Sequence, residues 1–142
     1  MDIRRIDDRI SVSPQITVAD VATLKAQGFT TIVNNRPDGE DMGQPDGDSI
    51  AAAAESAGLT YHAIPITHAG FSHPQIDAMT AVLADAPGQV LAYCRSGTRS
   101  CNLWALASAK RGEASDTLVA KGQAAGYDLS GMRPTLDALA GR

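Results

Sequence analysis

One short segment of the chain combines residue types suited to nucleophilic chemistry. Residues 94–100 read CRSGTRS, between an apolar run typical of a buried strand and a run typical of a helix. The N–H groups of such a loop and of the first helical turn have no internal partners, and this end of the helix dipole is positive. The segment therefore predicts an anion-binding loop with Cys94 as the nucleophile.

The other residues of this loop have complementary expected roles. Gly97 supplies the backbone freedom of a tight turn, and Arg99 offers a planar fork of donors. At the mouth of this loop, positive potential favours the Cys94 thiolate, which can form a covalent intermediate. Ser100 is expected to hydrogen-bond the sulfur. The remaining anion-binding candidates of the loop are Arg95, Ser96 and Thr98.

Residues outside the loop are also candidates for the site. His68 is the catalytic candidate of the preceding loop, whereas His62 and His73 suit structural or exposed positions. Arg36 either faces the pocket or braces its own loop, and Arg95 is either an anion contact or solvated. Cys101 suits core packing better than a resolving role. Helix caps and solvated turns account for an acidic cluster formed by Asp38, Glu40, Asp41, Asp46 and Asp48.

Apolar runs and capping signals alternate along the chain. Strands are expected at 3–6, 9–13, 29–34, 59–66 and 89–93, and helices at 17–27, 48–58, 72–87, 99–110, 113–125 and 131–140. This order predicts one α/β domain over 1–142, with a mostly parallel sheet of four to five strands and helices on both faces. Parallel strands place their carboxyl ends on one edge, so the loops 34–47, 67–72 and 94–99 should meet there.

Composition excludes several classes of function. The net charge of −4, from 12 basic and 16 acidic residues, gives no general attraction to nucleic acid or to anionic membranes. No apolar run approaches the roughly 20 residues of a membrane span, and the first residues lead into no signal peptide. Two cysteines form no disulfide framework or metal motif, so we expect a cytoplasmic protein without metal or cofactor.

The cysteine loop resembles those of two enzyme families. Tyrosine and dual-specificity phosphatases use C-x5-R, and rhodaneses often use C-R-x-G-x-R. Here four residues separate Cys94 from Arg99, as in rhodaneses, and Ser100 occupies the position of the phosphatase arginine. Residues 61–66, followed by a loop, a helix and the cysteine strand, are similar to the dual-specificity layout. With NRPDGE at 35–40, residues 1–110 resemble a bacterial phosphatase-like domain, also found fused to metallo-β-lactamase-type persulfide dioxygenases.

Three functions are compatible with this resemblance, and the first is sulfur transfer. A short loop, the lack of an Asp in 67–72 as the general acid of a phosphatase, and the fused relatives favour it. Cys94 would then carry a persulfide between a sulfane-sulfur donor and a thiol acceptor. The alternative is a phosphatase that forms a phosphocysteine from a phosphorylated substrate, with His68, or less favourably Asp38 or Asp41, as the acid. The third is a non-catalytic anion-binding domain.

Overall fold

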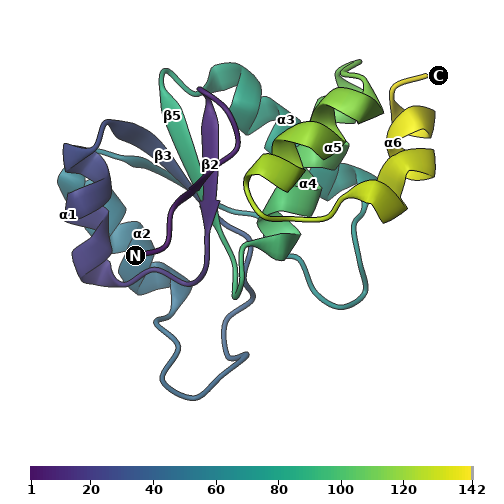
Figure 1. Cartoon of the computed structure of the whole chain (residues 1–142). Helices are drawn as coiled ribbons and strands as arrows, with labels where there is room; N and C mark the ends of the chain where they lie inside the picture. The colour runs from purple at the N-terminus through teal and green to yellow at the C-terminus, as the bar shows by residue number, and fades with distance from the viewer. Residues whose placement is uncertain (142) are drawn as a thin grey trace.

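A five-stranded sheet forms the centre of the molecule in a computed structural model that describes residues 1–141 (Figure 1). The strand order is β1-β2-β5-β3-β4, and only the β1–β2 pair is antiparallel. The strand bounds are β1 Arg4–Arg5, β2 Ile10–Ser13, β3 Phe29–Asn34, β4 Thr60–Ala63 and β5 Gln89–Tyr93. The mostly parallel α/β architecture expected from the sequence is confirmed.

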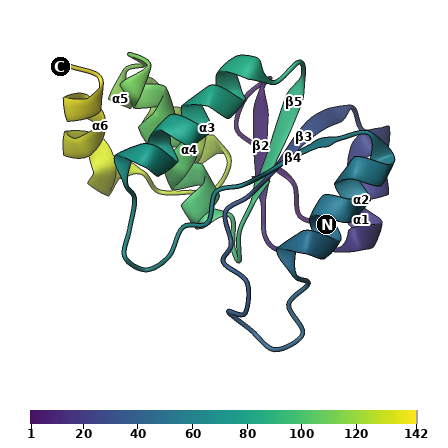
Figure 2. The same cartoon turned by 180° about the vertical axis from the view of Figure 1, so that it is seen from behind.

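Helices cover both faces of this sheet. One face carries α1 (Val18–Ala26) and α2 (Gly47–Ala57), which pack against each other. The other face carries α3 (His73–Asp85), α4 (Thr98–Lys110), α5 (Ser115–Ala124), the short 3-10 helix η1 (Ser130–Met132) and α6 (Arg133–Leu139). Figure 2 shows the two groups on opposite sides of the strands. None of the helices within residues 1–141 is long and apolar enough to cross a bilayer.

The central strand β5 is buried on both faces after its first residue, which explains why residues 90–93 form an uninterrupted run of Val, Leu, Ala and Tyr. Val90 and Ala92 belong to the hydrophobic cluster under α3 and α4, whereas Leu91 and Tyr93 belong to the cluster under α1 and α2. Successive side chains of a strand point to opposite faces, so one short run serves two cores. This double burial fixes the carboxyl end of β5, where Cys94 follows.

Local capping signals set most of the element boundaries. Thr17 and Asp20 form the expected capping box of α1, and Gly28 after its end has φ +93°. The helix expected to be capped by Asp48 is instead capped by Asp46, two residues earlier. The Asp46 carboxylate accepts the Ser49 N–H at 2.8 Å, and α2 begins at Gly47.

The expected strand 59–66 is shorter in the structure, where β4 ends at Ala63. Pro65 has no N–H to donate, so a regular ladder cannot continue through it. The N–H groups of Ile64 and Ile66 still bond to the carbonyls of Asn34 and Asn35, at 2.9 Å each. The chain therefore runs beside the end of β3 and places the Ile66 carbonyl next to the cysteine loop.

Candidate active site

Cys94 lies between the carboxyl end of β5 and the amino end of α4. Gly97 is the N-cap of α4 with φ +88°, and its N–H donates to Cys94 Sγ at 3.1 Å. The Cys94 side chain is completely buried. The strand–loop–helix geometry agrees with the sequence analysis, but the solvent access that a nucleophile needs is lacking in this conformation. A reaction at Cys94 therefore requires an opening of the site.

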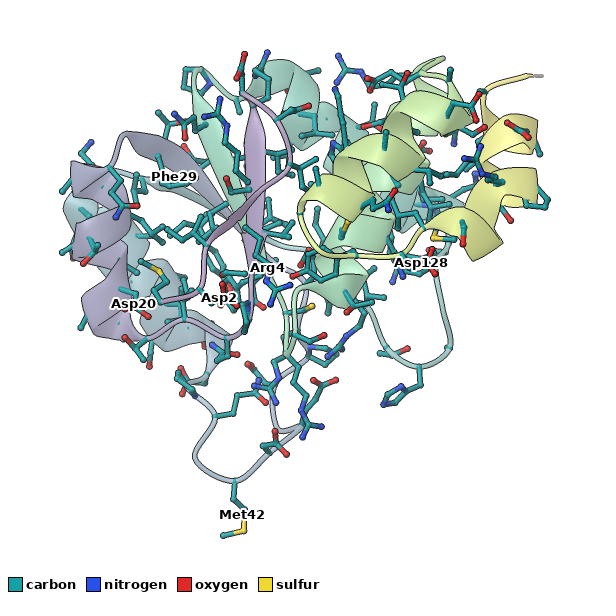
Figure 3. The ribbon with its side chains drawn as sticks, viewed as in Figure 1. Asp2, Arg4, Asp20, Phe29, Met42 and Asp128 are labelled. Carbon is teal, nitrogen blue, oxygen red and sulfur yellow. The ribbon has the colours of Figure 1, made fainter. Side chains whose placement is uncertain are left out.

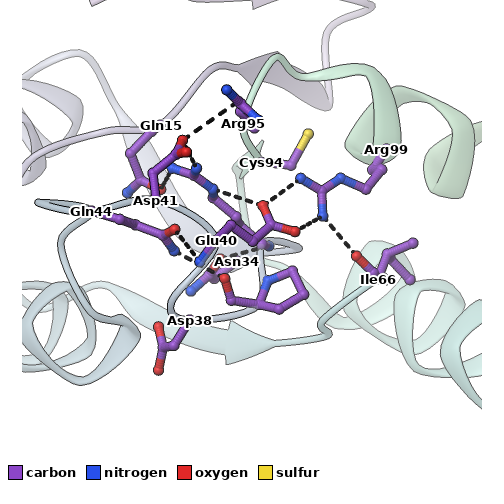
Figure 4. A network of polar contacts seen from close by, with 12 residues as sticks. Gln15, Asn34, Asp38, Glu40, Asp41, Gln44, Ile66, Cys94, Arg95 and Arg99 are labelled. Carbon is purple, nitrogen blue, oxygen red and sulfur yellow. Dashed lines mark hydrogen bonds and ion pairs between the residues drawn. The ribbon is translucent and has the colours of Figure 1, made fainter. Parts of the chain in front are cut away.

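Arg99 comes from the first turn of α4, and its guanidinium is held by a carboxylate of another loop. Its Nη1 and Nη2 donate to Oε2 and Oε1 of Glu40, both at 2.8 Å, and Nη1 also donates to the Ile66 carbonyl at 2.8 Å. Hydrogen bonds to Glu40 raise the pKa of Arg99, burial lowers it, and negative charge on Cys94 raises it again. Arg99 therefore lies within electrostatic reach of the sulfur while Glu40 occupies its fork (Figure 4).

Glu40 bridges two arginines and is the main residue that sequence reasoning missed. Besides Arg99, it accepts the Nε–H of Arg36 at 2.9 Å. The hydrogen bonds from Arg99 contribute most to lowering the pKa of Glu40, to about 2, against the opposing effect of burial. The sequence analysis placed Glu40 among solvated carboxylates, because nothing in the local pattern shows that a residue 59 positions later lies beside it.

Arg36 braces the loop between β3 and α2, which resolves the alternative left open by the sequence. It is 5% exposed and donates to Glu40, to Gln15 Oε1 at 3.2 Å and to Asp41 Oδ2 at 2.7 Å. All three guanidinium nitrogens are therefore engaged. Met42, at the tip of the same loop, is fully exposed and points away from the body of the molecule (Figure 3).

The outer side chains of the cysteine loop face solvent. Arg95 is two-thirds exposed, and its Nε lies 3.6 Å from Asp41 Oδ2. Ser96 and Thr98 are exposed, and their hydroxyl groups are hydrogen-bonded to each other at 3.0 Å. The backbone rather than these side chains therefore faces the buried sulfur, as the Gly97 amide does.

Ser100 is buried in the first turn of α4. Its Oγ has no hydrogen-bond partner among the residues that the structure describes. Leaving a buried hydroxyl unpaired costs about 1–3 kcal/mol. Such a cost is typical of a functional position whose partner arrives with a ligand.

Among residues 1–141, no hydrogen bond or ion pair joins His68 to the network around Glu40. It is exposed in a loop closed by a bridge between Thr67 and Gly70. His62 is half-buried in β4, and the His73 ring lies 3.1 Å from Lys110 Nζ. A catalytic role for His68 thus stays a prediction.

Cys101 lies on the core side of α4. Its side chain is fully buried within the larger hydrophobic cluster, and burial raises the pKa of its thiol to about 12. A thiol with so high a pKa is a poor nucleophile at neutral pH. This environment agrees with the packing role expected for Cys101.

Comparison with known proteins identifies the family. Residues 2–111 match the family described as "Beta-lactamase hydrolase-like protein, phosphatase-like domain". The beta-lactamase hydrolase-like protein of Agrobacterium fabrum is 37% identical over 126 residues, and that of Xylella fastidiosa strain Temecula1 is 36% identical over 130 residues. These alignments cover 88% and 91% of this chain, but only 29% and 30% of the longer relatives.

Solved structures share the fold over nearly the whole chain. A Neisseria meningitidis protein, assigned provisionally as a phosphatase, is 36% identical with a TM-score of 0.83, over 98% of this chain and 99% of its own. Tk-PTP in its active form has a TM-score of 0.73 at 18% identity, over 99% of this chain and 97% of its own, and so supports the fold alone. With its cysteine-phosphatase fold and the match over residues 2–111, the chain belongs to the phosphatase-like domain family of beta-lactamase hydrolase-like proteins.

Proposed function

We propose that this phosphatase-like domain is a cysteine-dependent phosphatase that hydrolyses phosphate monoesters through a phosphocysteine on Cys94. The observation that carries the proposal is the Gly97 N–H directed at Cys94 Sγ, at the amino end of α4 and within electrostatic reach of Arg99. The family match and the phosphatase likeness favour phosphate over the sulfur chemistry that the loop length favoured.

The proposed reaction has two steps. The Cys94 thiolate attacks phosphorus, the S–P bond forms, and the P–O bond to the leaving group breaks. Water then attacks phosphorus, so that inorganic phosphate leaves and the thiolate is restored. We propose that the Gly97 N–H, the unpaired Ser100 Oγ and, once Glu40 has left it, the Arg99 guanidinium donate to the phosphoryl oxygens.

Proton donation to the leaving group is the weak point of this site. In the closed arrangement Glu40 cannot supply the proton at neutral pH, because its bonds to Arg99 hold its pKa at about 2. Asp41 is ion-paired with Arg36 at 2.7 Å and lies 3.6 Å from Arg95. His68 remains the proposed acid. Because it is exposed and lies outside the hydrogen-bonded network, we expect the best substrates to be aryl phosphates, whose phenol leaving groups need little protonation.

In this proposal the loop between β3 and α2 moves to open a path to Cys94. This loop carries Glu40, whose carboxylate holds the Arg99 fork that a phosphate would otherwise use. Substrate oxygens can replace the carboxylate oxygens on the same donors, since carboxylate and phosphoryl groups can both accept two parallel N–H bonds from one guanidinium. In the proposed cycle the substrate phosphate replaces the Glu40 carboxylate on Arg99. Glu40 returns to Arg99 after inorganic phosphate leaves.

Sulfur transfer is the second candidate, favoured by the length of the cysteine loop. In that reaction the Cys94 thiolate attacks the sulfane sulfur of thiosulfate, forms an S–S bond and releases sulfite. An acceptor thiolate then takes the terminal sulfur and restores Cys94. The persulfide formed on Cys94 adds a single sulfur atom, which needs fewer oxyanion contacts than a phosphoryl group, so Arg99 can return to Glu40 while the sulfur is held.

One experiment distinguishes the two chemistries. The protein is mixed separately with para-nitrophenyl phosphate and with thiosulfate, quenched in acid, and the peptide containing residue 94 is analysed by mass spectrometry. The phosphatase proposal expects one added phosphoryl group and turnover that is lost in Cys94→Ser but kept in the matched variant Cys101→Ser. Added sulfur, with no hydrolysis of the aryl phosphate, would overturn the proposal in favour of sulfur transfer.

A further inference from the structure

A tyrosine from the C-terminal part of the chain contacts the cysteine loop. Tyr127 follows α5, and its hydroxyl donates to the Ser96 carbonyl at 3.0 Å. This residue lies beyond positions 2–111, over which the family match extends. We propose that Tyr127 is a positioning residue that aims the Gly97 amide at the catalytic sulfur, an inference that rests on the proposed role of Cys94 as nucleophile.

The geometry of a single peptide unit carries this inference. The Ser96 carbonyl and the Gly97 N–H belong to the same planar trans peptide, so they point in opposite directions. When the Tyr127 hydroxyl holds the carbonyl outward, the N–H is directed inward, where it donates to Cys94 Sγ at 3.1 Å. Rotation of this peptide would break both hydrogen bonds at once.

The close approach of Tyr127 also explains why position 97 is a glycine. A Cβ built at Gly97 would overlap the Tyr127 hydroxyl and lie 3.1 Å from the ring carbon Cζ that bears it. The φ of +88° at Gly97 also disfavours any other residue. The carbonyl of Gly97 accepts the Cys101 N–H at 2.9 Å, so the glycine is fixed on both sides.

The ring of Tyr127 is itself held in place. Arg4 of β1 lies over the ring, with its guanidinium carbon 5.3 Å from the centroid, and the tyrosine is 9% exposed. The Tyr127 N–H donates to the Gly122 carbonyl at 2.9 Å. Burial is the main cause that raises the pKa of Tyr127, so its hydroxyl keeps the proton that it donates to Ser96. Arg4 of β1 and the carbonyl of Gly122 near the end of α5 thus hold Tyr127 in place against the cysteine loop.

Tyr127→Phe tests the proposal by removing only the hydroxyl. The rate of Cys94 alkylation by iodoacetamide is followed against pH, with the modified peptide resolved by mass spectrometry. We expect the midpoint of this profile to rise, because the thiolate loses a well-aimed donor. For an aryl phosphate we expect kcat to fall about 3–10-fold with KM changed less than about 2-fold. Tyr61→Phe, which removes a hydroxyl hydrogen-bonded to Asn34 at 3.0 Å, is the matched control and should leave the midpoint unchanged.

A second variant tests the contact from the side of the loop. Gly97→Ala should reduce activity strongly in the parent. The double variant Gly97→Ala/Tyr127→Phe should lose less activity than the product of the two single-variant losses, because removing the hydroxyl relieves its overlap with the new Cβ. An unchanged alkylation midpoint in Tyr127→Phe, even with lowered stability, would overturn the positioning role. A raised midpoint in a protein that hydrolyses no phosphate ester would support the positioning role and refute the proposed function.

Discussion

Glu40→Gln is the substitution that tests the network around Arg99 most directly. The change keeps the shape of the side chain and removes the charge that joins Arg36 to Arg99. Both arginines stay in place without their shared carboxylate, and the Arg36 side chain is only 4% exposed. We expect the variant to fold but to be less stable than the parent at neutral pH.

The magnitude follows from the pKa of Glu40. Its bonds to Arg99, and then to Arg36, lower this pKa from 4.5 to about 2 against the effect of burial. At full strength the difference is equivalent to about 3 kcal/mol. The carboxylate side chain is 18% exposed, so solvent screening reduces the expected loss to about 2 kcal/mol.

The pH dependence has a definite sign. A carboxyl group with a lowered folded-state pKa stabilises the fold fully above its unfolded pKa, here 4.5, and loses this effect as pH falls through about 2. The stability difference between parent and Glu40→Gln should therefore be constant from pH 7 to about 5.5. It should shrink to less than half its neutral value by about pH 3.

Urea denaturation followed by tryptophan fluorescence measures this difference, since the single tryptophan, Trp104, is buried in α4. Glu55→Gln, on the exposed side of α2, is the matched control and should change stability by less than about 0.5 kcal/mol. A neutral-pH difference below about 0.5 kcal/mol, or one that does not vary between pH 7 and pH 3, would refute the reasoning.

Three further predictions concern the same site. Arg36→Met should lower the free energy of unfolding by about 2–4 kcal/mol because it removes the buried cation shared by Glu40 and Asp41. Arg95→Met should change it by under about 0.5 kcal/mol, and equal losses in urea denaturation would contradict the bracing role. Ser100→Ala should stabilise the protein by about 1 kcal/mol and weaken inhibition by orthovanadate; lowered stability would show that the hydroxyl has a partner. Across a series of aryl phosphates, kcat/KM should fall as the phenol leaving group becomes less acidic. This fall should be steeper in His68→Ala than in the parent, because the variant lacks the proposed acid, and identical slopes would exclude His68 as the acid.

Much of the fold was predictable from local signals. β5 has the bounds of the expected strand 89–93, and the capping box at Thr17 begins α1 where the sequence indicated. The predicted cap of α2 was wrong by two residues because Asp46 and Asp48 are both capable caps and only the backbone geometry selects between them. The length of β4 was overestimated, because the sequence analysis extended the strand through Pro65, where a regular ladder cannot continue.

The sequence by itself determined the cysteine loop, since strand, glycine, arginine and helix start are contiguous and their geometry follows from local backbone rules. Only the tertiary structure decided what surrounds that loop. Glu40 reaches Arg99 across 59 positions, and Tyr127 reaches Ser96 across 31. These contacts depend on the register of parallel strands and on how α5 ends beside β1, and neither leaves a periodic signal in the chain. The burial of Cys94 belongs to the same class, because it results from packing between segments distant in sequence.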